Sequence, residues 1–224
     1  AEDGIRDLVR SRGLGDVYKR QVYKPQNGSI LFDGEELIGE RPVTVARKGV
    51  GRTFQNLGLF MNLNLIDNLL LGRHLQMKTG FFSGALWWGR AKNEEIKNRQ
   101  KIETIIDLLE LQPYRYQPVG LLPYGIQKRV ELGRALSMEP RILLLDEPVA
   151  GMNLEETEDM ARYILEINNE LGVSILLVEH DMAMVMDIAD CVMALDFGQK
   201  IATGSPKEVQ SDQRVIAAYL GEAS

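Results

Sequence analysis

Residues 141–148 read RILLLDEP, and this stretch decides the fold. Its apolar run is uninterrupted, which is typical of a strand buried on both faces of a parallel sheet. Residues 174–179 (SILLVE) repeat the pattern, and an amphipathic helix is predicted between the two strands over about 155–171. Strand, helix and strand make a β-α-β unit, so the sequence predicts an α/β fold. The helix residues predicted to face the core are Met160, Ile164, Ile167 and Leu171.

Two adjacent carboxylates, Asp146 and Glu147, end the first of these strands. Acidic side chains at the end of a buried strand are costly unless their charge is used. In P-loop nucleotidases an aspartate at this place holds Mg²⁺, and the next glutamate can polarise the attacking water. We therefore expect Asp146 to bind magnesium and Glu147 to act as a general base. The alternative is a strand that simply ends in solvent.

Three weaker candidates lie elsewhere in the chain. Gly125, within LPYGIQ at 122–127, precedes a predicted helix, where backbone amides can face an anion. His180 follows the second buried strand, where it could touch a phosphate or a water. Gln55 lies in the loop sequence GRTFQN. Each has a plain alternative, namely an ordinary helix start, a structural histidine and a loop amide.

The two-strand unit is preceded by a long segment, about 57–138, that is predicted to be helical. Its clearest helix spans 93–111, with Ile102, Ile105, Ile106 and Leu109 on one stripe. The other predicted elements are short and bounded by turns. They are a strand at 28–33, a helix at 182–189, paired strands at 192–196 and 199–204, and a last helix that a capping box opens at Ser205. The expected architecture is an α/β core split by a helical lobe.

Composition narrows the class of protein. The chain has 224 residues and a formal charge of -6, which argues against a nucleic-acid partner. Its single cysteine, Cys191, excludes a disulfide framework and a cysteine-based zinc site. The most apolar stretch, Leu57 to Leu71, is interrupted by asparagines and an aspartate, so it does not meet the length of about 18 apolar residues that a membrane span needs. A role at a membrane would therefore depend on a partner.

The first residues, up to about Gln21, differ in character from the rest. They show neither strand alternation nor a helical face, and SRGLGDVYKRQ resembles translated adapter or vector sequence. We expect residues 1–21 to be a non-native segment and exclude them from the fold. The alternative is a genuine basic N-terminal arm.

The order of the motifs resembles that of the ATP-binding subunits of ABC transporters, from about Val22 to the C-terminus. The matching segments, in family terms, are the Q-loop at Gln55, the signature at 122–129, the Walker B strand at 142–148, the D-loop AGMN at 150–153 and the H-loop VEHD at 178–181. The resemblance implies a P-loop NTPase-like parallel-sheet core with an inserted helical subdomain at about 57–138, here truncated at its N-terminus. The ABC ATPase domain would then span 22–224, incomplete at its front.

The resemblance implies a site for ATP and Mg²⁺. Catalytic roles fall to Glu147, His180 and Gln55, and magnesium would be held by Asp146 and Gln55. The residues implied to contact the nucleotide are Leu122, Pro123, Tyr124, Gly125, Ile126, Gln127 and Asn153. The signature departs from the common LSGGQ form, because Tyr124 and Ile126 replace its first glycine and its glutamine.

The resemblance also implies partners. A second ATP-binding subunit, identical or different, would complete each site with its signature. Transmembrane permease subunits and, indirectly, a periplasmic or extracellular substrate-binding protein would complete a bacterial transporter, with this chain peripheral on the cytoplasmic face. The Tyr-Gly pair, AGMN, EHDMAMVM, the segment 73–84 and the ending VIAAYLGEA favour the branched-chain amino-acid importers. Urea importers and lipopolysaccharide exporters share parts of the pattern, and the sequence does not tell which substrate is carried.

One family motif does not occur in the sequence. The phosphate-binding loop G-x-x-x-x-G-K-[ST] is missing, and Gly15 to Lys19 has the wrong spacing to replace it. We therefore expect an ATPase by family whose printed chain is inactive. The alternative is a non-catalytic regulatory or structural relative, although the retained Glu147 and His180 argue against a lineage that abandoned hydrolysis.

Overall fold

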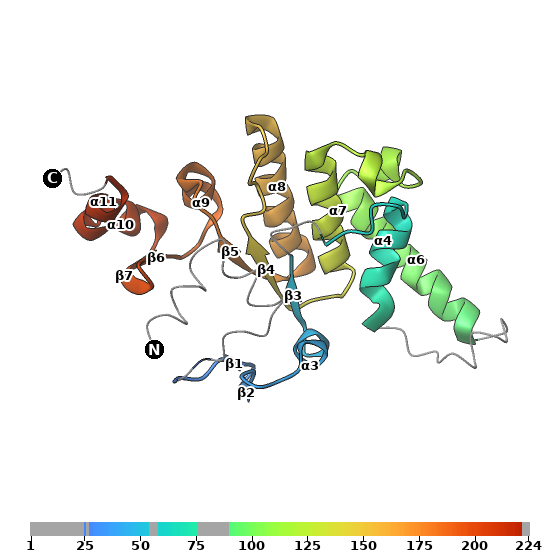
Figure 1. Ribbon diagram of the computed structural model, residues 1–224, viewed down its shortest axis with the longest axis horizontal. Coiled ribbons are helices and arrows are strands. Elements are labelled where there is room, and N and C mark those ends of the chain that lie inside the picture. Colours follow the sequence, from blue (N-terminus) through green and yellow to red (C-terminus); the bar gives the residue numbers. More distant parts are fainter. Residues whose placement is uncertain (1–24, 26, 54–57, 76–89, 221–224) are drawn as a thin grey trace. The chain divides into compact units, whose positions relative to one another are not determined.

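The computed structural model describes residues 25, 27–53, 58–75 and 90–220 (Figure 1). The chain divides into two compact units, one made of residues 1–40 and 178–224 and the other of residues 41–177. Each unit is described by itself below. In the described part of the chain, every helix is too short or too polar to cross a membrane.

The larger unit is built on a three-stranded sheet in the order β3-β4-β5. The strands are β3 (Val50–Arg52), β4 (Ile142–Asp146) and β5 (Ser174–Val178). β3 runs parallel to β4. β4 is buried as its apolar run predicts, since Leu143 and Leu145 are at most 1% exposed. The expectation for β5 was wrong in one respect, because Leu176 is 55% exposed and only part of this strand is covered.

Helices pack beside this sheet in the same unit. They are α3 (Pro42–Arg47), α4 (Leu65–Gly72), η1 (Arg73–Leu75), α6 (Arg90–Leu108), η2 (Gln112–Tyr114), η3 (Val119–Leu121) and α7 (Tyr124–Leu136). The predicted stripe of α6 is confirmed, since all four of its apolar residues are buried. The helix ends earlier than predicted, at Leu108, because Glu110 adopts the left-handed φ of 52°.

The helix predicted between the two buried strands is α8 (Leu154–Leu171). It begins with a capping box between Asn153 and Glu156 and ends at Gly172, whose φ of 64° suits a glycine. Three of the four predicted core residues are buried, but Leu171 is 44% exposed because the helix ends there. Tyr163, which the pattern did not single out, is completely buried.

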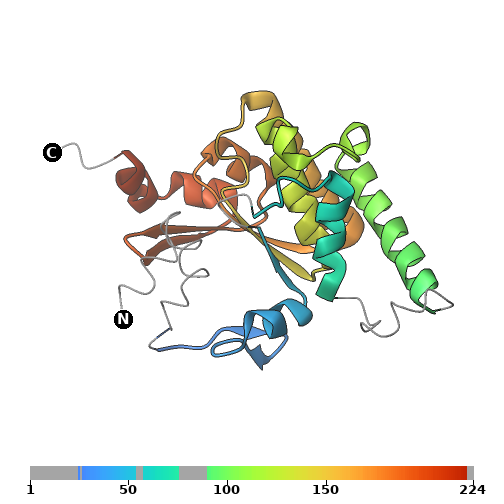
Figure 2. The ribbon, with the colours of Figure 1, turned by 45° about the vertical axis from the view of Figure 1, so that its right-hand side comes forward.

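The smaller unit holds a β-hairpin and the C-terminal elements. A turn at Asp33 joins β1 (Leu31–Phe32) to β2 (Glu35–Glu36), so the strand predicted at 28–33 is shorter than expected. The C-terminal elements are α9 (Met182–Ile188), β6 (Val192–Asp196), β7 (Gln199–Gly204), α10 (Pro206–Ser211) and α11 (Gln213–Leu220). The antiparallel pairing of β6 with β7 is confirmed (Figure 2).

One expectation for the C-terminus needs correction. The capping box at Ser205 is present, but it opens the short helix α10 and not the last helix. Asp212 leaves the helical conformation with ψ of 123°, which ends α10, and α11 then begins as a separate helix at Gln213.

Candidate functional site

Asp146 lies at the carboxyl end of β4 and is only 3% exposed. Its nearest described charge is Arg52 on the adjacent strand β3, with Arg52 Nη2 3.6 Å from Asp146 Oδ2. Neither carboxylate oxygen has a hydrogen-bond partner. Burial raises the pKa of Asp146 above its usual range, although Arg52 opposes this effect. A buried carboxylate without hydrogen-bond donors is suited to a divalent cation, which prefers oxygen ligands.

Glu147 follows at a sharp change of chain direction. Its φ is 48°, in the left-handed region that non-glycine residues seldom occupy. The turn is held by a hydrogen bond from the Ala150 amide to the Glu147 carbonyl, 3.2 Å long, and by one from Met152 to Val149. The side chain is half-buried. Uncommon backbone conformations of this kind concentrate at functional sites, so the geometry agrees with a role for the Glu147 carboxylate in chemistry.

The signature segment begins helix α7. Pro123 is the N-cap, Tyr124 is the first helical residue, and Gly125 lies inside the first turn rather than before the helix as expected. Leu122 and Ile126 are buried in the core. The Gln127 side chain donates a hydrogen bond of 2.8 Å to the Leu122 carbonyl and so closes the turn. Only Pro123 and Tyr124 are exposed in this segment.

The D-loop segment packs directly on the signature segment. A Cβ added at Gly125 would lie 2.2 Å from Glu156 Oε1, and one added at Gly151 would lie 3.3 Å from the Tyr124 ring. Both positions therefore require glycine for close approach, and Gly151 also has a φ of 80°. The Asn153 side chain accepts from the Glu156 amide at 3.0 Å, so its carboxamide oxygen caps α8.

Two predicted site residues are not brought together with the others. Gln55 lies outside the described residues. His180 belongs to the smaller unit, just after β5, and its side chain is 75% exposed, with Nδ1 3.7 Å from Glu179 Oε2. The larger unit therefore holds Asp146, Glu147, the signature segment and Asn153, and the roles of Gln55 and His180 stay predictions.

Two basic residues near the site were missed by the sequence analysis. Arg52 immediately precedes TFQ in the Q-loop segment, and Lys128 follows the signature in α7. Lys128 is only 4% exposed and its Nζ lies 5.7 Å from the centre of the Tyr124 ring. Both lower the pKa of Asp146, against the stronger effect of burial. A charged residue inside an otherwise conventional motif was the available signal for each.

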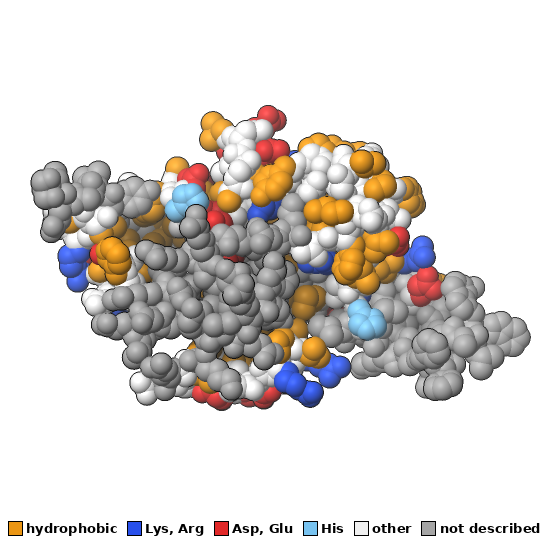
Figure 3. Space-filling view, viewed as in Figure 1, with side chains coloured by type: hydrophobic (Ala, Val, Ile, Leu, Met, Phe, Trp, Pro, Cys, Tyr) orange, Lys and Arg blue, Asp and Glu red, His pale blue; other side chains and the backbone are white. Residues whose placement is uncertain are grey.

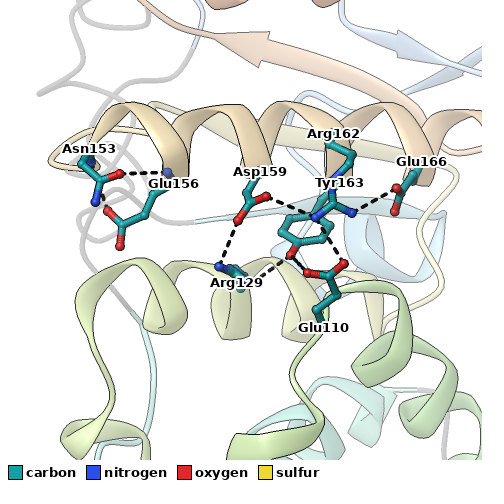
Figure 4. A network of polar contacts seen from close by, with 8 residues as sticks. All are labelled: Glu110, Arg129, Asn153, Glu156, Asp159, Arg162, Tyr163 and Glu166. Atoms are coloured by element: carbon teal, nitrogen blue, oxygen red, sulfur yellow. Dashed lines mark hydrogen bonds and ion pairs between the residues drawn. The ribbon is translucent and has the colours of Figure 1, made fainter.

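A network of polar contacts ties α7 to α8 behind the signature (Figure 4). The Tyr163 hydroxyl accepts a hydrogen bond from Arg129 Nη1 at 2.8 Å and donates one to Glu110 Oε2 at 2.9 Å. Arg129 also pairs with Asp159 at 3.3 Å. The guanidinium groups of Arg129 and Arg162 lie 5.2 Å and 4.4 Å from the centre of the Tyr163 ring. Because Tyr163 is completely buried, this network is a fixed part of the fold.

The network makes a prediction about alkaline stability. Burial, and next the hydrogen bond to Glu110, raise the pKa of Tyr163 to about 12. Its unfolded value is about 10, so the unfolded chain loses this proton first and stability falls as the pH rises from about 10 to about 12. Below pH 10 the contribution is fully present. We expect Tyr163 to account for a loss of about 2–3 kcal/mol over this window.

Urea unfolding at pH 9 and pH 11.5 measures the effect. The Tyr163→Phe variant should be less stable than the parent at pH 9, and the difference should shrink at pH 11.5. Tyr116→Phe is the matched control, since Tyr116 is 74% exposed and its removal should leave the pH dependence unchanged. Equal pH dependence in the parent and Tyr163→Phe would contradict the assignment.

A parallel-sheet α/β unit with a buried aspartate and a glutamate at a strand end, beside a glycine-containing helix start, defines the class of nucleotide-hydrolysing cassettes. Comparison with known families agrees with this class. The ABC transporter family model matches residues 20–150, and the model for the branched-chain amino acid ATP-binding cassette transporter matches residues 199–224. The chain belongs to the ABC transporter family, as an ATP-binding subunit.

Named relatives cover most of the chain. It is 38% identical to the high-affinity branched-chain amino acid transport ATP-binding protein BraF of Pseudomonas aeruginosa, over 90% of this chain and 79% of that protein. It is 39% identical to LivG of Escherichia coli strain K12, with the same coverage. Among solved structures, a nucleotide-free ATP-binding cassette from an ABC transporter has a TM-score of 0.74 and 25% identity, covering 99% of this chain and 84% of that one. The ADP conformation of the cassette MJ1267 has a TM-score of 0.73 and 27% identity, covering 89% and 79%. The α/β fold class predicted from the sequence is thereby confirmed.

Proposed function

We propose that this chain is the ATP-binding subunit that energises an importer of branched-chain amino acids. The substrate class follows BraF and LivG, whose names state branched-chain amino acid transport, and the match of the C-terminal residues 199–224 supports the same class. The chemistry rests on one observation, the buried Asp146 followed by Glu147 at the end of β4. The domain bounds of 22–224, with a helical subdomain at about 57–138, are part of this proposal.

The residues present fit a magnesium nucleotide. Asp146 would hold Mg²⁺ with its unpartnered carboxylate oxygens, and Gln55 would be a second ligand. When bound, the ion neutralises charge on the phosphates. Glu147 accepts a proton from the attacking water, and His180 and Gln55 contact the edge of the site.

The signature segment, with Asn153 of the D-loop, contacts the nucleotide held by a second ATP-binding subunit. It presents the start of α7, where the helix dipole favours a phosphate. Each site is therefore completed only when two subunits face each other. Whether the second subunit is identical or different does not alter this chemistry.

The phosphate-binding loop bears on activity. Because the motif G-x-x-x-x-G-K-[ST] does not occur in the 224 residues, we propose that the printed chain binds ATP weakly and does not hydrolyse it. Residues 1–21 would be a non-native replacement of the family's front. We define the front-restored chimera as this chain with residues 1–21 replaced by a family front segment that contains the motif.

The transmembrane partner would contact the segment 57–90. Its described part exposes apolar side chains, and hydrophobic side chains gather over the helical segments of the larger unit in Figure 3. Those exposed between 58 and 75 are Phe60, Met61, Leu63 and Leu71. A groove of about 230 Å³ lies beside Phe60 and is lined also by Leu71, Arg134 and Met138. Phe81, Phe82, Trp87 and Trp88, which the sequence also suggested, lie outside the described residues.

The loop that presents Phe60 is held by one buried side chain. The Asn68 carboxamide accepts from the Phe60 amide at 2.9 Å and donates to the carbonyls of Phe60, Leu63 and Asn64. Asn68 is completely buried, and Arg134 of α7 donates to the Gly58 carbonyl at the other end of the loop. The exposed position of Phe60 is therefore built into the fold, which supports a contact role for it.

We expect Phe60→Ser to weaken assembly with the transmembrane subunits by at least about tenfold, since a central aromatic contact is commonly worth about 2 kcal/mol or more. Co-purification from membranes at graded subunit concentrations measures the effect. Phe197→Ser is the control, because Phe197 is also exposed, at 77%, but lies in the smaller unit. Intact assembly of Phe60→Ser would remove this loop from the interface.

The proposed function is tested with the front-restored chimera in an E. coli K12 strain that lacks LivG. Restored uptake of labelled leucine, together with ATP turnover by the purified chimera, is the expected result. ATP turnover without leucine uptake would overturn the substrate class and leave the ATPase assignment standing. Absence of turnover would overturn both. The same cells, fractionated, test the proposed peripheral location on the cytoplasmic face of the membrane.

A further inference from the structure

We propose that Tyr163 is a positioning residue that holds the signature segment (122–127) and the D-loop segment (150–153) as one rigid body. The proposal rests on the proposed function for its consequence in catalysis, because both segments would face the nucleotide of a second subunit. Its structural content rests only on contacts within the larger unit.

The two segments meet at the first turns of their helices. Gly125 of the signature lies against the Glu156 side chain, and the Tyr124 ring lies against Gly151. Glu156 is itself fixed by the capping box, since its Oε2 accepts from the Asn153 amide at 3.0 Å. These contacts leave no room for a side chain at either glycine, so a small rotation of α7 against α8 would be felt at once in the D-loop.

Further along the helices, the angle between α7 and α8 is set by Tyr163. Its ring is completely buried, and its hydroxyl bridges Arg129 on α7 and Glu110 after α6. Three segments distant in sequence therefore meet at one oxygen atom (Figure 4). A hydroxyl placed between a guanidinium and a carboxylate has little freedom, because both bonds are charge-assisted and directional.

Charges around the ring reinforce this arrangement. Arg129 pairs with Asp159, one turn before Tyr163 on α8, and Arg162 pairs with Asp159, Glu166 and Glu110. Glu110 takes part only because its φ of 52° ends the preceding helix and turns the chain toward α8. A helix pair connected only by apolar side chains could rotate with little loss, whereas this pair would leave charged groups without partners.

The variant Tyr163→Phe tests the proposal, since it removes the hydroxyl and keeps the ring between the two guanidinium groups. Hydrogen–deuterium exchange of the full 224-residue chain reports on two sets of protected amides. One set is in α7 after the signature, where the Gln127 amide bonds the Pro123 carbonyl. The other spans 152–157, where Met152, Glu156 and Thr157 donate to the loop and cap.

We expect exchange in both sets to rise together, by about tenfold, in Tyr163→Phe. Amides of β6 and β7 should keep their parent rates. The matched control is again Tyr116→Phe, at a tyrosine that is 74% exposed. A change confined to α8 near residue 163, a uniform change over all segments, or no change would each overturn the proposal.

Two more variants guard against loss of folding. Glu110→Gln keeps an acceptor for the Tyr163 hydroxyl, so exchange in both sets should stay near the parent rates. Arg129→Lys keeps the charge but loses the fork that reaches both Tyr163 and Asp159, so both sets should exchange faster. If Glu110→Gln and Arg129→Lys behaved alike, the hydroxyl bridge would not be the holding element.

Kinetics separate this inference from the proposed function. In the front-restored chimera, Tyr163→Phe should lower kcat for ATP and leave KM unchanged, because the signature acts on the closed pair of subunits. An equal rise in KM would overturn the positioning role. If the chimera hydrolysed no ATP at all, the proposed function would fail, and the exchange experiment would still decide whether Tyr163 couples the two segments.

Discussion

We expect Glu147→Gln in the front-restored chimera to hydrolyse ATP about 10²–10⁴-fold more slowly than its parent, because a positioned general base contributes about that much. The amide that replaces the carboxylate has nearly the same shape but cannot accept a proton from water. Nucleotide binding should be retained, since Asp146 would still hold the magnesium ion. Single-turnover hydrolysis and ATP titration together measure the separation of binding from chemistry.

The control for this prediction is Glu158→Gln, an exposed glutamate on α8. It should leave turnover within about twofold of the parent, as expected for a surface substitution. Unchanged turnover in Glu147→Gln would remove this residue from the mechanism, even if the chimera proved to be an active ATPase.

We expect the chain as printed to bind Mg-ATP with a dissociation constant above about 1 mM, and the front-restored chimera to bind in the micromolar range. The difference corresponds to at least about 4 kcal/mol. The reason is that the missing loop supplies most of the hydrogen-bond donors to the β- and γ-phosphates. What the chain retains is Asp146 for the metal and Glu147 for the water, and neither holds a phosphate.

Isothermal titration calorimetry of both proteins tests this second prediction. A chimera that also carries Asp146→Asn serves as the control for magnesium dependence, and it should lose affinity for Mg-ATP but not for ATP alone in the presence of a chelator. Micromolar binding by the printed chain would show that residues 1–21 form a working replacement of the loop, and our interpretation of them as foreign would fail.

Much of the candidate site could be predicted from short stretches of sequence. Asp146 and Glu147 were identified because an uninterrupted apolar run predicts a buried strand, and a charge at its end is conspicuous. The motif order then identified the family, and the comparisons confirm it. The positions of Gln55 and His180 relative to Asp146 stay predictions. Arg52, which pairs with Asp146, was missed because its proximity depends on β3 lying next to β4.

Local structure was determined by the sequence wherever its cause is local. The stripe of α6, the capping box at Ser205 and the pairing of β6 with β7 each depend on side-chain period or on bonds between near neighbours. Tertiary structure alone decided which residues meet across the chain. Glu110, Arg129 and Tyr163 have no shared pattern, yet one buried hydroxyl joins them. Likewise, Leu176 carries the apolar signal of a core strand but is 55% exposed, because burial is set by what packs on a strand and not by the strand itself.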